Sequence, residues 1–361
     1  MGNQHRSASL TRNPSATYLP RYPDRRDTIR HPMKKLAGLL LFCACAFAQT
    51  KKILVVGMTD AIPALQSVSP NVKVVAGERS KLVEQIVDAD AIFGTLSPEL
   101  FRAAKKLKWV QTYSAGVENI RFPEFTNSNV VLTNCKIIQG PEIADHALAM
   151  LLSLTRELHR LIPARTSEEW HKEQWHPIEL RGKVAVVIGL GGIGSQIAQR
   201  ASAFGMTVIG VDPKDIPFSP SVSKVVTPNR LDDVLPKADV VFVSAPHTPE
   251  SEGMMGSKQF NEMKKGSYFI AVSRGKLYSS EALVKALDEQ RLAGAGLDVT
   301  NPEPLPKGHA LWKFPNVIIT PHIAGESDGI QARRVELMKE NIARFDKGET
   351  LLNVVDKVKG Y

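Results

Sequence analysis

The chain has 361 residues, a length that predicts two domains at roughly 100–200 residues each. With 43% hydrophobic and 23% charged residues it has a globular composition, which excludes a wholly disordered, collagen-like or disulfide-scaffold protein. Of the formal net charge of +9, most lies in residues 1–50, which hold eight Lys or Arg and two acidic residues. The following 38 basic and 35 acidic residues nearly balance, so we expect no nucleic-acid partner.

Residues 33–48 have the pattern of a secretory signal peptide. Lys34 and Lys35 precede an apolar run, residues 36–47, that is too short to span a bilayer as a mature helix, and a small-x-small cleavage signal follows. Residues 1–32 are rich in Arg, Pro and Ser without apolar periodicity, which predicts a disordered extension ahead of the true start. We therefore expect a Sec-type signal from Met33 to Ala48, export to the periplasm, and no membrane partner for the mature chain.

Three alternatives to this interpretation stay open. Arg25 and Arg26 would begin a twin-arginine signal, although residues 27–29 fit that motif poorly. Cys45 would be a lipidation site, although the residues before it form a poor lipobox. In the third alternative the protein is cytoplasmic, where nicotinamide cofactors are abundant, and the apolar run is an artefact of a misassigned start.

The part of the body up to residue 148 alternates short apolar runs with helical stretches. Strands interleaved with helices predict a parallel sheet that is covered on both faces. An apolar stripe predicts a longer helix over about residues 142–161. The expected strands are residues 53–57, 72–75, 91–93, 109–112 and 130–132, with helices over residues 80–87 and 98–106.

A second alternating series begins at Lys183. Its six expected strands, joined by crossovers such as the helices over residues 193–204 and 280–290, predict a doubly wound Rossmann domain. A last amphipathic helix is expected over about residues 328–345. The strands of this series are expected at residues 184–189, 207–211, 239–244, 268–272, 294–297 and 317–320.

A GxGxxG motif connects the first strand of this series to the helix that follows. Gly189 permits a tight turn, Gly191 lets a pyrophosphate approach the backbone, and Gly194 permits close packing of helix on strand. The amino end of the helix then faces the negative charge of the phosphates. Together with Gly192, these residues predict a dinucleotide site.

Asp212 ends the second strand of the series, close to the roughly 20-residue offset expected for the acid that binds a ribose 2′-hydroxyl. Its carboxylate would accept a hydrogen bond from that hydroxyl and repel a 2′-phosphate, so we expect NAD as the cofactor. Lys214, a cation nearby, is the argument for NADP. The alternatives are a glycine turn with a surface Asp, or a methyltransferase with a similar loop.

Three further polar residues each follow a predicted strand of this series: Arg274, Glu303 and His322. Because ligands bind beyond the carboxyl ends of parallel strands, we expect the three side chains to converge beside a nicotinamide. Taken singly, each has a simpler explanation: a solvated Arg, a loop Glu and a structural His. Their joint placement favours a site, and no pattern predicts a metal.

The chemistry of these three side chains is complementary. Hydride reduction of a 2-oxo acid needs a proton donor for the carbonyl oxygen, and a His changes its charge near neutral pH. A carboxylate beside it, Glu303, favours the imidazolium and orients the ring. Arg274 offers a planar fork to an anionic carboxylate, so it can anchor the substrate.

Eight motifs over about residues 52–357 resemble the D-isomer-specific 2-hydroxyacid dehydrogenases. They are YSAGVEN from Tyr113, GPEIADHALAMLL from Gly140, GLGGIG from Gly189, VDP from Val211, APHTPES from Ala245, SRG from Ser273, LDVTNPEPLP from Leu297 and TPHIAG from Thr320. The resemblance implies that Arg274, Glu303 and His322 are the catalytic trio. The usual Asn before the Arg is Ala271 here, and the usual Leu of the segment after Pro246 is His247.

The resemblance also implies residue roles around the trio. Asp298 would contact the nicotinamide carboxamide, and the backbone at Ala115 and Gly116 would hold the substrate carboxylate together with Arg274. Ile193 would pack near the pyrophosphate and Thr248 near the cofactor. His247 is expected to be structural, and a second acid is its alternative role.

At the level of the fold, the resemblance implies an α/β protein of two doubly wound parallel-sheet domains. A Rossmann NAD-binding domain, residues 149–322, is inserted into a flavodoxin-like substrate domain, residues 51–148 and 323–361. A homodimer formed through the cofactor domain is also implied.

The expected substrates are small unphosphorylated 2-oxo acids, such as glyoxylate or hydroxypyruvate. The short stretch after His322 predicts that the regulatory domain of long phosphoglycerate dehydrogenases is absent. Two other functions use the same fold: an NAD(H)-sensing interaction protein of the corepressor kind, and an exported binding protein with vestigial chemistry.

Overall fold

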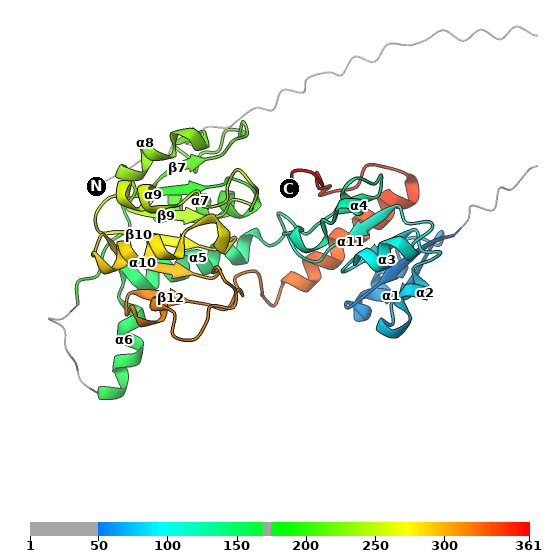
Figure 1. Cartoon of the computed structure of the whole chain (residues 1–361), viewed down its shortest axis with the longest axis horizontal. Coiled ribbons are helices and arrows are strands. Elements are labelled where there is room, and N and C mark those ends of the chain that lie inside the picture. The colour runs from blue at the N-terminus through cyan, green and yellow to red at the C-terminus, as the bar shows by residue number, and fades with distance from the viewer. Residues whose placement is uncertain (1–49, 169, 171–174) are drawn as a thin grey trace, which may run out of the picture. The chain divides into compact units, whose positions relative to one another are not determined.

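The structure, a computed structural model, describes residues 50–168, 170 and 175–361. The expected extension and signal peptide, residues 1–48, lie outside the described residues. The chain after residue 47 forms one unit that contains two separate parallel sheets (Figure 1). Within the described residues, no helix has the length and apolar content that crossing a membrane requires.

The first sheet has five strands in the order β2-β1-β3-β4-β5, and every neighbouring pair is parallel. This is the flavodoxin-like order, and it confirms the five strands expected from the sequence. The strands are β1 (Lys51–Val55), β2 (Val72–Ala76), β3 (Ala91–Phe93), β4 (Trp109–Gln111) and β5 (Val131–Thr133), and the helices between them are α1 (Ile62–Gln66), α2 (Leu82–Gln85), α3 (Pro98–Ala103) and α4 (Pro123–Thr126).

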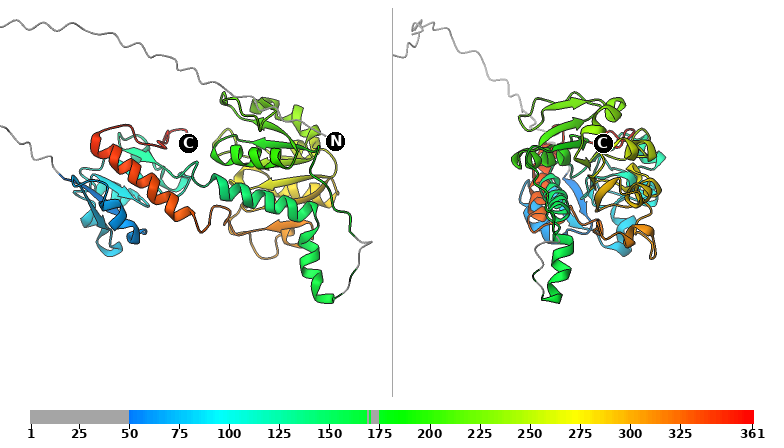
Figure 2. Two further views of the ribbon diagram at one scale, coloured as in Figure 1. Left: turned by 180° about the vertical axis from the view of Figure 1, so that it is seen from behind. Right: turned by 90° about the vertical axis from the view of Figure 1, so that its left-hand side faces the viewer.

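The end of the chain returns to this first sheet. Helix α11 (Ile330–Lys347) lies along it (Figure 2) and buries Met338 and Ile342 in the same apolar core as Trp109. After α11, the amide of Val355 donates to the carbonyl of Leu132 at 2.9 Å, which joins the last segment to β5. The second sheet is therefore an insertion in the first body, as expected.

The second sheet has seven parallel strands in the order β12-β11-β10-β9-β6-β7-β8. The order reverses between β6 and β9, as in a Rossmann fold. The six expected strands are confirmed, and β8 is an addition: it is a three-residue edge strand with two exposed residues, so its apolar signal is weak. The strands are β6 (Val184–Ile188), β7 (Thr207–Val211), β8 (Lys224–Val226), β9 (Val240–Val243), β10 (Ser267–Ala271), β11 (Leu292–Leu297) and β12 (Val317–Ile319), and the helices include α7 (Gly192–Ala203), α8 (Leu231–Val234), α9 (Ser257–Glu262) and α10 (Ser280–Asp288).

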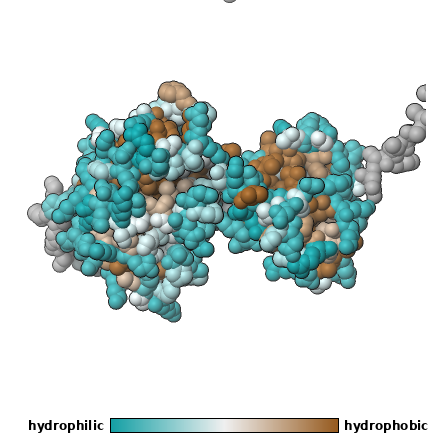
Figure 3. Space-filling view, turned by 45° about the horizontal axis from the view of Figure 1, so that its top comes forward, coloured by the Kyte–Doolittle hydropathy of each residue, from teal (hydrophilic) through white to brown (hydrophobic). Residues whose placement is uncertain are grey.

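Both faces of the seven-stranded sheet are covered. Val186 and Ile188 of β6 enter the core beneath α10, whereas Ala185 and Val187 enter the core on the opposite face. Since both sets of side chains are buried, β6 has no polar alternation, which is why its sequence is a continuous apolar run. Away from the cores, the face shown in Figure 3 is mainly hydrophilic with separate apolar patches.

The expected helix over residues 142–161 is two helices, α5 (Gly140–Thr155) and α6 (Leu158–Ala164). Glu157 between them has φ +58°, a left-handed conformation that ends the first helix. The expected domain boundary after residue 148 falls inside α5, yet α5 contributes Ile143, Ala147 and Leu151 to the core of the seven-stranded sheet. The whole of α5 therefore packs with that sheet.

Candidate active site

The polar residues expected to carry chemistry follow three neighbouring strands. Arg274 comes after β10, Glu303 after β11 and His322 after β12, and these strands are adjacent in the sheet. Carboxyl ends of parallel strands share one edge of a sheet, so the three loops lie at the same edge. The loops after β10 and β11 also touch, because a Cβ on Gly275 would come within 2.0 Å of the Thr300 carbonyl oxygen.

The structure brings His322 and Glu303 into direct contact. Nδ1 of His322 lies 2.7 Å from Oε1 of Glu303, and both side chains are partly exposed, at 43% and 41%. A carboxylate only accepts hydrogen bonds, so Nδ1 carries a proton and Nε2 is the nitrogen that can exchange a proton with a substrate. The pair thus has the arrangement of an oriented acid or base.

The backbone at His322 adopts an unusual conformation. Its φ is +55°, a left-handed value that is uncommon outside glycine and whose cost in free energy other contacts must offset. Asp298 supplies the restraint: its carboxylate accepts from the amides of Ile323 at 2.9 Å and Ala324 at 3.0 Å. Asp298 is only 2% exposed, so the structure places it beneath the loop that carries His322.

Arg274 pairs with Glu118, which lies in the segment after β4 of the five-stranded sheet. Its Nε and Nη2 donate to the two carboxylate oxygens of Glu118, at 3.1 and 3.3 Å, and its Nη1 donates to the Ser273 carbonyl oxygen at 2.6 Å. Burial raises the pKa of Glu118, but the Arg274 charge and a backbone hydrogen bond outweigh it and leave the pKa below its usual value. In the described part of the chain, no hydrogen bond or ion pair joins Arg274 to Glu303 or His322.

One of the two expected substrate-binding backbone positions, Gly116, lies against this guanidinium. A Cβ on Gly116 would come within 1.6 Å of Nη2 of Arg274, so the guanidinium lies directly on the Gly116 backbone. The carbonyl oxygen of Ala115 accepts from the Asn134 side chain at 2.6 Å. The structure therefore brings Gly116 and Arg274 together, while Ala115 is held by Asn134.

The glycine loop has a geometry that fits a dinucleotide. Gly189 has φ +87°, and a Cβ on Gly194 would come within 1.7 Å of the Gly189 carbonyl oxygen, so only glycine fits this helix against this turn. A Cβ on Gly191 would meet nothing within 4 Å, which leaves open space at the amino end of α7 where a pyrophosphate binds in this fold. Gly192 packs against Ile137, and Ile193 is half-buried against the core.

Asp212 lies at the end of β7, next to the glycine loop. It is 8% exposed, and its carboxylate accepts from the amides of Leu190 at 2.8 Å and Lys214 at 2.9 Å. These bonds fix the carboxylate beside the loop and use only one lone pair on each oxygen. The ammonium of Lys214 lies over the ring of Tyr361, 4.3 Å from its centroid.

Thr248 and His247 lie in the turn after β9. Thr248 is buried, and its hydroxyl accepts from the Ser251 amide at 3.3 Å. Nε2 of His247 lies 3.1 Å from a carboxylate oxygen of Glu252, in keeping with a structural role. Sequence reasoning missed Ser244 in this region, whose hydroxyl donates to the Gly189 carbonyl oxygen at 2.8 Å and so joins β9 to the glycine turn.

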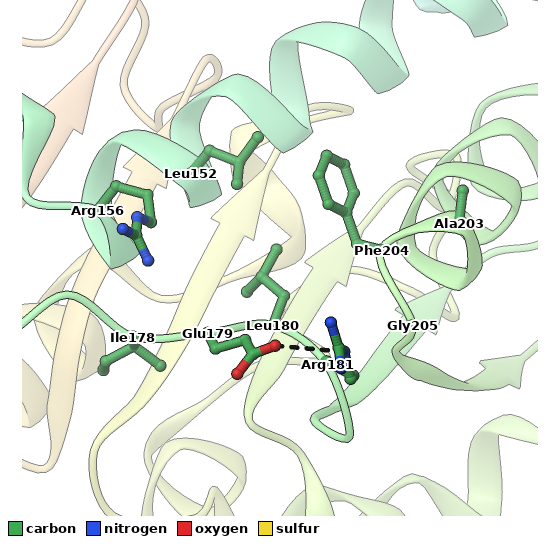
Figure 4. A pocket seen from close by; sticks show the side chains of 9 residues that line it. All are labelled: Leu152, Arg156, Ile178, Glu179, Leu180, Arg181, Ala203, Phe204 and Gly205. Atoms are coloured by element: carbon green, nitrogen blue, oxygen red, sulfur yellow. Dashed lines mark ion pairs between the residues drawn. The ribbon is translucent and has the colours of Figure 1, made fainter.

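A cavity of about 450 Å³ lies at the opposite edge of the seven-stranded sheet, where residues just before β6 and β7 meet the end of α5 (Figure 4). The residues around it include Leu152, Arg156, Ile178 and Phe204, none of which is an expected site residue. We therefore locate the site at the carboxyl edge and not in this cavity. Among residues 50–168, 170 and 175–361 there is no group of His, Cys, Asp or Glu side chains that could hold a metal.

The fold and this edge of the sheet together define a two-domain dehydrogenase that uses a nicotinamide dinucleotide. Residues 148–324 match the family model of the D-isomer specific 2-hydroxyacid dehydrogenase NAD binding domain. The chain is 33% identical over 286 residues to glyoxylate reductase of Korarchaeum cryptofilum, covering 76% of this chain and 85% of the relative. It is 32% identical over 305 residues to D-3-phosphoglycerate dehydrogenase of Methanocaldococcus jannaschii, covering 82% of this chain and 57% of that protein.

Solved structures agree with these sequence relatives. A D-isomer specific 2-hydroxyacid dehydrogenase of Xanthobacter autotrophicus, in complex with NADPH and MES, superposes with a TM-score of 0.76 at 26% identity, covering 86% of this chain and all of that one (100%). The chain belongs to the D-isomer-specific 2-hydroxyacid dehydrogenase family. It is an oxidoreductase that depends on NAD or NADP.

Proposed function

We propose that the protein reduces small 2-oxo acids, such as glyoxylate and hydroxypyruvate, to D-2-hydroxy acids with NADH. In this proposal His322 is the acid or base, Glu303 is its partner and Arg274 anchors the substrate carboxylate. The observation that carries the proposal is the 2.7 Å contact between His322 and Glu303 at the carboxyl edge of the Rossmann sheet.

The cofactor, when bound at the glycine loop, supplies or accepts the hydride. The chain's own residues manage the proton and the charge. Nε2 of His322 gives a proton to the carbonyl oxygen as that oxygen becomes an alcohol, and Glu303 holds Nδ1 and stabilises the positive charge on the ring. In the oxidative direction the same nitrogen accepts the proton.

Arg274 retains donors for a substrate although Glu118 already pairs with it. A guanidinium has five N–H groups. Glu118 uses one on Nε and one on Nη2, and the Ser273 carbonyl uses one on Nη1. One N–H on each terminal nitrogen is left for a substrate carboxylate. In this arrangement Glu118 orients the arginine without using all of its donors.

Asp212 supports a preference for NADH. Its buried carboxylate beside the glycine loop would repel a 2′-phosphate and accept from a 2′-hydroxyl. Lys214 is the opposing feature, and the structural relative from Xanthobacter is described with NADPH. In this structure, however, the Lys214 ammonium is engaged with the ring of Tyr361.

The substrate class rests on the relatives. The curated relative from Korarchaeum is named a glyoxylate reductase, whereas the relative named for phosphoglycerate is covered over only 57% of its length. The corepressor alternative predicts cofactor binding without turnover, and the paired His322 and Glu303 favour the enzyme.

The decisive experiment is consumption of NADH and NADPH by the full chain with a panel of 2-oxo acids. We expect turnover of glyoxylate and hydroxypyruvate, a loss of roughly 10²-fold or more in His322→Ala, and NADH affinity largely kept. His176→Ala is the matched control, because this exposed histidine lies outside the site. Cofactor binding without turnover of any 2-oxo acid would support the corepressor function, and turnover unchanged in His322→Ala would contradict the assignment.

A homodimer through the NAD-binding body is part of the proposal. Apolar side chains are exposed on α6, with Leu158 at 42% and Ile162 at 60%, and α6 extends away from the seven-stranded sheet (Figure 2). Packing these side chains against a second copy would remove apolar surface from water. Light scattering should give twice the chain mass for the parent and the single mass for Ile162→Glu; a monomeric parent would contradict the dimer.

Export through a signal peptide from Met33 to Ala48 is likewise proposed on the sequence pattern alone. Fractionation after expression from Met33, with sequencing of the amino terminus, tests it. An amino terminus at Gln49 in the periplasmic fraction would support export, and an uncleaved cytoplasmic chain would contradict it.

A further inference from the structure

A second histidine lies behind the loop that carries His322. His146 is on α5, and its Nε2 is 2.9 Å from the hydroxyl oxygen of Thr320, two residues before His322. The Thr320 hydroxyl in turn lies 2.6 Å from Oδ1 of Asp298. Neither the expected catalytic trio nor the expected cofactor residues include His146 or Thr320.

The hydrogen bonds that link His146, Thr320 and Asp298 have a definite direction. Thr320 has one hydroxyl proton, and the Asp298 carboxylate, which only accepts, takes it. The Thr320 oxygen must then accept from His146, so Nε2 of His146 carries a proton. Nε2 of His146 is also 3.7 Å from Oδ1 of Asp298, a distance at which its proton or positive charge is attracted to the carboxylate.

The hydrogen-bond network that begins at His146 ends at the backbone around His322. The same Asp298 carboxylate accepts from the amides of Ile323 and Ala324, which directly follow the left-handed His322. The Asp298 side chain is 1% exposed, so no water competes for these bonds at its buried oxygens. Three donors from one loop therefore converge on one buried carboxylate, and His146 orients one of the three.

We propose that His146 is a positioning residue for the reaction: it donates to Thr320, fixes the Thr320 hydroxyl on Asp298, and so holds the left-handed loop that presents His322 to Glu303. This inference rests on the proposed role of His322. Since α5 packs on the core of the seven-stranded sheet, the contact between His146 and Thr320 ties the loop after β12 to a packed helix. Loss of the Nε2 donor leaves the loop folded but less restrained.

The test uses variants of the full chain that separate the donor from the shape of the side chain. The amide nitrogen of Gln reaches the place of a histidine Nε2, whereas that of Asn reaches only the place of Nδ1. We expect His146→Asn and Thr320→Val to lower kcat with glyoxylate roughly tenfold, with KM and NADH affinity within about twofold of the parent. His146→Gln and Thr320→Ser should retain most of the activity, and the double variant His146→Asn/Thr320→Val should lose no more than the worse single variant.

Amide hydrogen exchange of Thr320, His322, Ile323 and Ala324 gives a readout that does not depend on turnover. Exchange should be faster in His146→Asn than in the parent or His146→Gln. Unchanged exchange in His146→Asn would overturn the inference whatever the activity. The inference would also fail if His146→Asn and His146→Gln lost the same kcat and both had lowered melting temperatures, because the side chain would then act by packing alone. If the parent turns over no 2-oxo acid while exchange behaves as expected, the proposed function fails and the loop restraint stands.

Discussion

Nδ1 of His322 lies 2.7 Å from Oε1 of Glu303, although the two residues follow different strands of the Rossmann sheet. The two strands, β11 and β12, are adjacent in the sheet, and the backbone at His322 is left-handed. This pair explains how one carboxylate can orient the ring and stabilise its charge while the other ring nitrogen stays available.

Replacing Glu303 by Gln should separate these two effects. The amide keeps a hydrogen-bond acceptor for Nδ1 but removes the negative charge, so the protonated ring loses its stabilisation. We expect turnover to fall roughly tenfold or more and the NADH dissociation constant to stay within about twofold. Steady-state rates and NADH fluorescence measure the two quantities; a rate equal to the parent's would show that the carboxylate charge contributes nothing.

Two glycines of the nucleotide loop should respond differently to alanine. Gly191 has φ −66° and open space around it, so Gly191→Ala should fold normally but weaken NADH binding by roughly tenfold or more, because the methyl group occupies the place of the pyrophosphate. In Gly194→Ala the new Cβ would collide with the Gly189 carbonyl oxygen, so stability should fall by about 1–3 kcal/mol. Thermal melts and NADH titrations distinguish the two; equal melting temperatures would contradict the packing role of Gly194.

Substitution of Asp212 by Asn tests cofactor choice with the least change of shape. The Asn oxygen can still accept from one of the two backbone amides that Asp212 binds, but the negative charge that would repel a 2′-phosphate is gone. We expect the ratio of kcat/KM for NADPH over that for NADH to rise roughly tenfold. A variant as selective as the parent would remove Asp212 from the discrimination.

Glu118 should matter for substrate affinity more than for cofactor affinity. Glu118→Gln removes the charge that orients Arg274, and because both side chains are about one-third exposed the expected rise in KM for glyoxylate is modest, roughly two- to fivefold. If Glu118 instead competed with the substrate for Arg274, KM would fall. NADH affinity should not change in either case.

The same pair has a predictable dependence on pH. Because the pKa of Glu118 in the folded protein lies below its usual value of about 4.3, the pair contributes stability above that pH and loses it as the pH falls through the lowered pKa. Acid melts should therefore show a smaller loss of stability in Glu118→Gln than in the parent. Parallel curves would indicate that the pair does not stabilise the folded chain.

Much of the fold could be predicted because its signals are local. The buried parallel strands are continuous apolar runs, and Gly194 in the turn after β6 is required by its steric contact with the nearby Gly189 carbonyl oxygen. β8 was missed because a short edge strand with exposed residues lacks this signal. The break between α5 and α6 was missed because Glu157 has a left-handed backbone, and a glutamate in the sequence does not indicate that conformation as a glycine would.

The candidate site was only partly predictable for a different reason. The position of Arg274, Glu303 and His322 after successive strands follows from the sheet edge, but the partner of each side chain depends on contacts between residues far apart in the sequence. Glu118 lies 156 residues from Arg274, and His146 lies 174 residues from Thr320. Glu118 and His146 stand within motifs that carry the family resemblance, yet nothing local indicates which groups they meet.

The most direct test of the central claim combines a label on the transferred hydride with removal of the proposed proton donor. The full chain is given hydroxypyruvate and NADH deuterated at the transferable position of C4, and the product is analysed by mass spectrometry and chiral chromatography. We predict D-glycerate with one deuterium at C2, formed by the parent and reduced roughly 10²-fold or more in His322→Ala. Absence of labelled product, formation of the L-isomer, or equal labelling by the His322→Ala variant would contradict the account.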